Sequence, residues 1–313
     1  MPLYLGHSTA QRILERPEIV GLPRSDVSRL EHCFSGKTDL AQLDLSPLKD
    51  VSEPFDVLVN SPKQVRRLPN YRYHQCPEHL PAGAFIELAN DIYVASPELL
   101  FVLRSRELSF PQAVDLGCRL CGTFCYEENG NILKRQRITT PERLQTFVEC
   151  CGHIAGIKRA RRAVNWVIPN AASPMEPSCA IPFYLSRRLG GFGFPIPELN
   201  YQINLSPAEA AIAGKKKIFI DVYWRDFGFG FEYQGKNTHG TYDALRSDIA
   251  RQLAAEEHHI DLQMMTIDQL SEESQRLAVA RKMARYFGVS LDLNNDFVRR
   301  NQAMVDQLLR GCE

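Results

Sequence analysis

The sequence predicts a mixed α/β (α+β) protein built from two domains. Helix-type and strand-type patterns alternate along all 313 residues, a length that corresponds to about two domains. Apolar residues make up 44% of the chain and charged residues 24%, which is typical of an ordinary globular protein. The stretch PNAASP separates two sets of elements. We therefore expect an N-terminal α+β domain at 1–168 and a C-terminal α/β domain at 169–313.

The N-terminal domain is expected to begin with short helices and turns and to continue with strands and then helices. Apolar patterns predict strands within 55–75 and a strand pair at 85–94. Helices are predicted to start where Ser or Thr is followed by Pro and Glu, because proline is favoured at the first helical position. Such starts lie at Ser96 and Thr140, and further helices are expected from Ser109 and over 158–167.

The C-terminal domain is predicted to have the order αβββαβ, followed by two helices. A helix is expected from Ser173, with Pro182 disfavouring a regular continuation. The elements that follow are a strand at 201–205, a β-hairpin at 217–234, a helix at 242–256, a strand at 260–267 and helices at 272–287 and 296–309. This order is typical of a mixed sheet flanked by helices.

The predicted hairpin carries acids on both strands. Asp221 lies in the first strand and Glu232 in the second, and side chains two apart on a strand share a face, so Glu232 and Gln234 point the same way. Two carboxylates from neighbouring strands suit a hard divalent cation such as Mg²⁺ or Mn²⁺. The alternative is that both acids are exposed polar positions of an ordinary hairpin.

Glu176 can form a capping box with Ser173, since Ser-x-x-Glu is the pattern of that cap. Two residues that follow the second strand are further candidates for the site. Lys236 follows the second strand and can supply a cation. A metal held by such carboxylates can hydrolyse a phosphodiester, and His239 could contact the scissile phosphate or act as a general base. The alternative is that His239 is a loop residue.

The run from 221 to 270 resembles the Vsr-like branch of the PD-(D/E)XK nuclease superfamily, in particular a domain-of-unknown-function endonuclease family that often follows AbiEi-type N-terminal regions. The resemblance covers about residues 170–285, and 85–170 more weakly. It rests on features that occur in the family's order, namely Asp221, Glu232, Gly235, His239, Asp248, Arg251 and the segment from Thr266 to Leu270.

The resemblance implies a restriction-endonuclease-like fold and a Mg²⁺- or Mn²⁺-dependent DNA endonuclease, linked to phage defence or DNA repair. Asp221 and Glu232 would hold the metal, with Gln234, Lys236 and Glu176 completing the site. The N-terminal domain would recognise DNA or a protein partner. Gln234 stands where the family has Asp and the wider superfamily Lys. This departure supports an alternative, a non-catalytic DNA-binding regulator that retains the scaffold.

Any contact with DNA must come from local basic clusters, because the formal net charge is zero. The candidates for phosphate contacts are Arg159, Arg161, Arg162, Lys217 and Arg251. The alternative is that the basic clusters are solvated faces and that Arg251 forms an ion pair on its helix.

The cysteines are expected to be reduced packing residues of a cytosolic protein. There are nine of them, irregularly spaced, and no secretory signal or membrane span is evident. Cys118, Cys121 and Cys125 are predicted to form one buried helical stripe, and Cys150 and Cys151 are also expected in the core.

Overall fold

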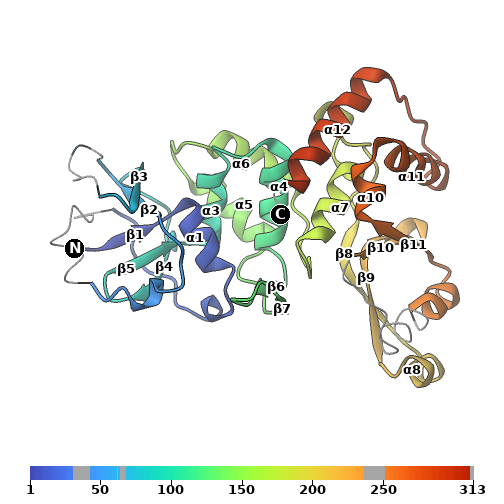
Figure 1. Ribbon diagram of the computed structural model, residues 1–313, viewed down its shortest axis with the longest axis horizontal. Helices are drawn as coiled ribbons and strands as arrows, with labels where there is room; N and C mark the ends of the chain where they lie inside the picture. Colours follow the sequence, from blue (N-terminus) through green and yellow to red (C-terminus); the bar gives the residue numbers. More distant parts are fainter. Residues whose placement is uncertain (31–42, 62, 64–67, 236–250, 311–313) are drawn as a thin grey trace. The chain divides into compact units, whose positions relative to one another are not determined.

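The protein has the predicted mixed α+β fold (Figure 1). The computed structural model describes residues 1–30, 43–61, 63, 68–235 and 251–310. Contacts divide the chain into two compact units, Met1–Val167 and Ile168–Glu313, where the sequence places the division between residues 168 and 169. Among the described residues, no helix has the length and apolar character needed to cross a bilayer.

The first unit contains a five-stranded sheet of order β3-β2-β1-β5-β4. The central strand β1 runs parallel to β5 and antiparallel to β2, and β2 runs parallel to β3. The sequence predicted every strand of this sheet except β1, whose three residues are too few to establish a period. The strands are β1 (Leu3–Leu5), β2 (Phe55–Val59), β3 (Tyr71–Gln75), β4 (Phe85–Ala89) and β5 (Ile92–Ala95).

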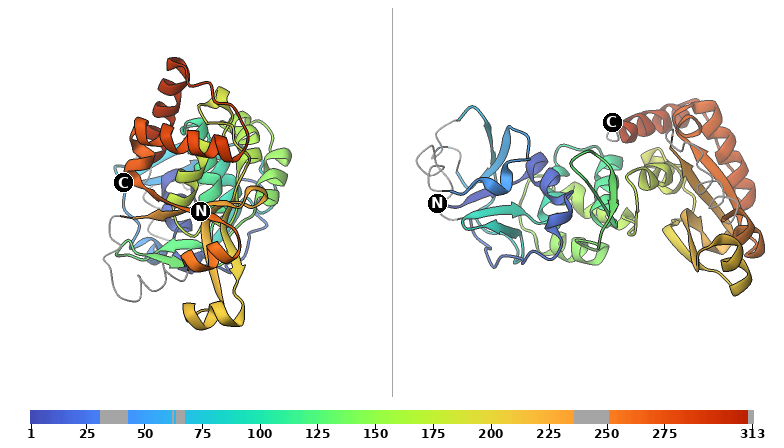
Figure 2. Two further views of the ribbon diagram at one scale, coloured as in Figure 1. Left: turned by 90° about the vertical axis from the view of Figure 1, so that its right-hand side faces the viewer. Right: turned by 60° about the horizontal axis from the view of Figure 1, so that its bottom comes forward.

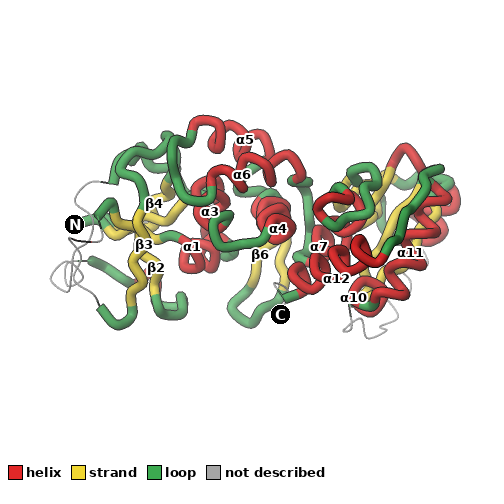
Figure 3. Tube along the Cα trace, turned by 90° about the horizontal axis from the view of Figure 1, so that it is seen from above, coloured by secondary structure: helices red, strands yellow, loops and turns green. Residues whose placement is uncertain are grey.

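Helices pack beside this sheet (Figure 3). The predicted starts are confirmed at Ser96 and Thr140, where each side chain accepts a hydrogen bond from the backbone N–H three residues ahead. Ser109 begins the next helix with a capping box. The helices are α1 (His7–Leu14), α3 (Pro97–Arg104), α4 (Phe110–Leu120), α5 (Pro141–Cys150) and α6 (Ile157–Ala163).

The predicted cysteine stripe is wrong in its geometry, although its three members are buried. Helix α4 ends before Cys121, and Cys125 lies on strand β6 (Phe124–Tyr126), which pairs with β7 (Ile132–Lys134). Cys150 is exposed, contrary to the expectation, whereas Cys151 is buried. The reason is that the buried face of α5 carries Leu144, Phe147 and Val148, and position 150 falls outside it.

The second unit contains a four-stranded mixed sheet of order β11-β10-β9-β8. The predicted hairpin is confirmed as β9 and β10, which pair antiparallel, and β10 runs parallel to β11. The strands are β8 (Glu198–Asn204), β9 (Lys217–Trp224), β10 (Phe229–Gln234) and β11 (Asp261–Thr266).

Helices lie beside this sheet (Figure 2), and aromatic side chains of the two layers pack together. Phe183 packs against Phe231, with their ring centroids 5.5 Å apart, and Phe287 lies 5.8 Å from Trp224. Two short helices, α8 and α10, were not predicted. Residues 251–257, which lie within the helix predicted at 242–256 and one residue beyond it, are helical. The helices are α7 (Met175–Tyr184), α8 (Pro207–Ala213), α10 (Ile267–Ser271), α11 (Glu273–Tyr286) and α12 (Asn295–Leu309).

Helix α7 continues through Pro182, which corrects the expectation that this proline would disfavour a regular helix. The helix is buried around Pro182, since Ile181 and Phe183 are both fully buried. The backbone also finds partners outside the helix, because the Pro182 carbonyl accepts a hydrogen bond of 2.9 Å from the Phe192 N–H. Tertiary packing therefore outweighs the local cost of the proline.

A buried arginine joins the closing helices of the second unit. Arg276 is fully buried, and its guanidinium donates to the Asn301 side chain at 2.7 Å, the Leu270 carbonyl at 2.6 Å and the Gln302 side chain at 2.6 Å. Removing a buried donor leaves such acceptors unsatisfied, at a cost of about 1–3 kcal/mol.

We expect Arg276→Leu to lower the free energy of unfolding by about 2–3 kcal/mol, because several buried acceptors lose their donor together. Urea denaturation followed by circular dichroism measures this change. Arg281→Leu, at an exposed position of the same helix, is the matched control and should leave the midpoint unchanged. Equal midpoints for the two variants would show that the buried guanidinium is dispensable.

Candidate metal centre

Three carboxylates from three elements gather in the second unit. Asp221 lies on β9, Glu232 on β10 and Glu176 in the first turn of α7. The register pairs Val222 with Phe231, which brings Asp221 and Glu232 opposite each other on the two strands. Glu176 and Glu232 are buried, with only 3% and 2% of their surface exposed, and Asp221 is half-buried.

The β-sheet is irregular at the position of Asp221. The backbone N–H of Asp221 donates to Glu232 Oε1 at 3.3 Å, and the N–H of Tyr233 donates to Asp221 Oδ2 at 2.9 Å. On the other side, Asn200 is skipped in the pairing of β8 with β9, between Leu199 and Tyr201, and has a φ of +49°. Strand irregularities often occur beside active sites because they redirect side chains.

Glu176 has a different local role from the one expected. The residue that caps α7 is Pro174 and not Ser173, and this cap makes no side-chain hydrogen bond. Glu176 Oε2 instead accepts a hydrogen bond of 2.8 Å from the Ala172 N–H. The carboxylate thus satisfies a backbone donor near the helix start and lies near Asp221 at the same time.

The negative charge of Asp221 raises the proton affinity of both glutamates. Burial, followed by the negative charge of Asp221, raises the pKa of Glu176 well above its usual range. The same two causes raise the pKa of Glu232 to about 8, and burial raises the pKa of Asp221. Groups perturbed in this way concentrate at functional sites. A divalent cation would remove the repulsion, because it favours the ionised form of every carboxylate.

Arg251 is a cation in direct contact with this group. Its guanidinium pairs with Glu232 Oε2, and the two residues are 19 positions apart in the sequence. The sequence made Arg251 a candidate for a DNA phosphate contact or for an ion pair on its own helix. The observed pair is with the strand carboxylate, where the positive charge offsets part of the repulsion from Asp221.

The remaining predicted residues of the site are placed as follows. Gln234 is half-buried and lies opposite Thr266 in the register of β10 and β11. Lys217 begins β9, four residues or about 13 Å along the strand from Asp221, and its Nζ donates to the Gln202 side chain at 3.2 Å. Lys236, His239 and Asp248 lie outside the described residues.

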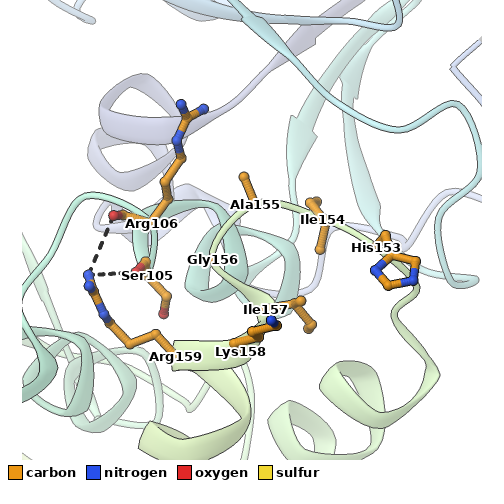
Figure 4. A pocket seen from close by; sticks show the side chains of 9 residues that line it. All are labelled: Ser105, Arg106, His153, Ile154, Ala155, Gly156, Ile157, Lys158 and Arg159. Atoms are coloured by element: carbon orange, nitrogen blue, oxygen red, sulfur yellow. Dashed lines mark hydrogen bonds between the residues drawn. The ribbon is translucent and has the colours of Figure 1, made fainter.

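The arginines of α6 lie in the first unit and hold its helices together. Arg159 donates to the Ser105 carbonyl at 3.0 Å, beside a cavity that Lys158 and His153 also line (Figure 4). Arg161 donates to the carbonyls of Val148 and Cys151 at 3.0 Å and 2.7 Å. Arg162 lies over the ring of Phe110, with its guanidinium carbon 5.2 Å from the ring centroid.

A second group of metal-ligating side chains was not expected from the sequence. His7, His74 and Glu107 meet in the first unit, with ligand atoms all within 4.8 Å of one another. Three isolated residues far apart in the chain form no recognisable spacing, so only the fold reveals them.

Comparisons with family models, curated protein sequences and solved structures found no match for this chain.

Proposed function

We propose that the second unit is a divalent-metal-dependent nuclease that hydrolyses phosphodiester bonds in DNA. The facing carboxylates of Asp221 and Glu232 on neighbouring strands carry this proposal, with Glu176 near enough for Asp221 to raise its pKa. Carboxylate oxygens are ligands that suit Mg²⁺ or Mn²⁺. DNA as the substrate, a restriction-endonuclease-like fold, and a role in phage defence or DNA repair rest on the resemblance of the 221–270 run. The reduced cysteines expected from the sequence suit a cytosolic enzyme.

The proposed chemistry assigns each side chain a task. A bound Mg²⁺ would supply a Lewis acid and activate a water. Asp221 and Glu232 would hold the ion from the two strands, and Glu176 would face it from α7. Gln234 would orient water or a phosphate oxygen through its amide, since it is neutral and cannot act as a base. In this proposal the first unit binds DNA or a protein partner.

A second candidate function is a non-catalytic DNA-binding regulator. Two observations favour it. Gln234 replaces the charged residue of the resembling family, and Arg251 already neutralises Glu232. In that case the three carboxylates would remain from a nuclease ancestor and would bind no metal ion.

A cleavage assay separates the two functions. Plasmid and single-stranded DNA are incubated with the full chain and Mg²⁺ or Mn²⁺, and a parallel reaction contains EDTA. The nuclease proposal expects cleavage that EDTA abolishes. DNA binding without cleavage under every condition would favour the regulator.

We expect the affinity for Mn²⁺ to rise steeply with pH between 6 and 8. The pKa of Glu232 is about 8 without a bound ion, so below that pH the ion must displace a proton. Displacing one proton strengthens apparent binding by about tenfold for each pH unit. Isothermal titration calorimetry at pH 6, 7 and 8 measures the trend. Glu232→Gln should bind more weakly with a flatter profile, and a flat wild-type profile would contradict the prediction.

A further inference from the structure

We propose that the first unit binds a divalent transition metal through His7, His74 and Glu107. The three residues come from the start of α1, from β3 and from the loop after α3. Their ligand atoms lie within 4.8 Å of one another. This site lies in a different unit from Glu176, Asp221 and Glu232, and it does not depend on the proposed nuclease activity.

His7 presents the strongest evidence. The side chain is only 5% exposed, and Nδ1 lies 2.9 Å from Glu107 Oε1. Even so, Nδ1 makes no hydrogen bond with any described residue. An ion bound to both atoms would satisfy this buried nitrogen. With metal–ligand bonds of about 2.0–2.2 Å, neighbouring ligand atoms of a tetrahedral ion lie about 3.4 Å apart, so Nδ1 and Oε1 need to move only slightly.

The backbone of His7 has a φ of +45°, a conformation that non-glycine residues seldom adopt and that often occurs at functional sites.

His74 is oriented by a buried carboxylate. Its Nε2 lies 2.8 Å from Asp56 Oδ1, and Asp56 is only 2% exposed. Asp56 is fixed in turn by Thr9, whose N–H donates to Oδ2 at 3.3 Å. With Nε2 bonded to Asp56, Nδ1 is left to bind an ion. A carboxylate that fixes the outer nitrogen of a ligating histidine is the usual arrangement around protein-bound metals.

The two imidazoles lie together at this point. Their ring centroids are 3.9 Å apart and their planes differ by 22°. Because an imidazole nitrogen binds a metal in the plane of its ring, both rings must turn from this stacked arrangement when they bind one ion. The Glu107 carboxylate is the third ligand of the proposed site, with Oε1 beside His7 Nδ1. Arg104 binds its Oε2 at 2.5 Å, which leaves Oε1 toward His7. The Glu107 side chain is 41% exposed, and this gives an ion a path from solvent.

Arg159 holds the loop that carries Glu107. Its guanidinium donates to the carbonyls of Ser105 at 3.0 Å and Arg106 at 3.4 Å (Figure 4) and also bonds the Leu108 carbonyl. The backbone is thus fixed on both sides of Glu107. In this proposal Arg159 positions a metal ligand.

The ligand set indicates which ions fit. Two imidazoles and one carboxylate suit Zn²⁺, with a fourth position open to water or a substrate. The carboxylate group in the second unit has oxygen ligands only and suits Mg²⁺ or Mn²⁺. The chain would therefore carry two sites with different ion preferences.

The test measures zinc retained by the full chain. Protein loaded with Zn²⁺ is dialysed against metal-free buffer, and its zinc content is determined by mass spectrometry. We expect about one equivalent in the wild type and in Asp221→Asn, and a loss of that equivalent in His7→Asn, His74→Asn and Glu107→Gln. Asparagine tolerates the positive φ at position 7. His153→Asn, at an exposed histidine of the same unit, is the control and should retain zinc.

Cobalt spectroscopy distinguishes these ligands from cysteine thiolates. The expected Co²⁺ complex has visible d–d bands without thiolate charge-transfer absorption, and it disappears in Glu107→Gln, the variant at the most exposed ligand. Circular dichroism confirms that each variant is folded. The proposal is overturned if the wild type retains no zinc, if the three ligand variants retain as much as His153→Asn, or if Co²⁺ shows thiolate ligation.

Discussion

Asp221→Asn is expected to lower metal-dependent DNA cleavage at least about 100-fold. Loss of a residue that merely supports a metal ligand costs about 10–100-fold in affinity or activity, and in the proposed site Asp221 is itself a ligand. Asparagine keeps an oxygen that can accept the hydrogen bond from the Tyr233 N–H. The fold of the hairpin should therefore survive while the negative charge is lost.

The matched control for this variant is Asp226→Asn. Asp226 is an exposed residue in the turn of the same hairpin, so its replacement changes the net charge equally without touching the carboxylate group. Initial rates of plasmid nicking at several Mn²⁺ concentrations measure both variants. Similar rates for Asp221→Asn and Asp226→Asn would remove Asp221 from the catalytic site.

Glu176→Gln is expected to stabilise the metal-free protein at pH 8 by about 1–2 kcal/mol and to abolish cleavage. Active-site residues are often kept at a cost in stability, and their removal commonly recovers about this amount. Burial and Asp221 raise the pKa of Glu176 in the folded state. Its carboxyl thus favours folding at low pH, and this contribution is lost as the pH rises above the ordinary glutamate value. A neutral amide at position 176 does not ionise, so it keeps its contribution to stability as the pH rises.

The gain in stability of Glu176→Gln should therefore appear as a pH-dependent difference between its melting temperature and that of the wild type. At pH 8 without metal, Glu176→Gln should melt about 2–6 °C above the wild type, and the difference should shrink toward pH 5. Glu256→Gln, at an exposed position, should show no such trend. A lower melting temperature for Glu176→Gln at pH 8 would mean that the carboxylate stabilises the fold, as a cap would.

Most elements of the fold could be predicted because long periodic patterns and caps are local properties of the sequence. The helices at Ser96 and Thr140 and the hairpin that carries Asp221 are examples. Strand β1, with three residues, contains too little pattern. The prediction for helix α7 was wrong at Pro182, because the continuation of the helix past this residue depends on burial that only the tertiary structure supplies.

The candidate metal centre could be predicted in part for the same reason. Alternation along a hairpin predicts that Asp221 and Glu232 can meet, whereas Glu176 was a candidate only through the resemblance to the nuclease family. The pair between Arg251 and Glu232 could not be anticipated, since it joins elements across a long connection. The contacts of His7 with His74 are of the same kind, because a helix start and a strand distant in the sequence bring them together.

The most direct test of the proposed metal centre is the anomalous diffraction of a crystal soaked in Mn²⁺. We expect a peak within coordination distance, about 2.2 Å, of oxygens from Asp221 and Glu232, with Glu176 facing the ion. The hydrogen bond from the Asp221 N–H to Glu232 Oε1 should then lengthen as that oxygen turns toward the ion. Mn²⁺ peaks only elsewhere, with the three carboxylates still bonded to backbone N–H groups and Arg251, would contradict the account.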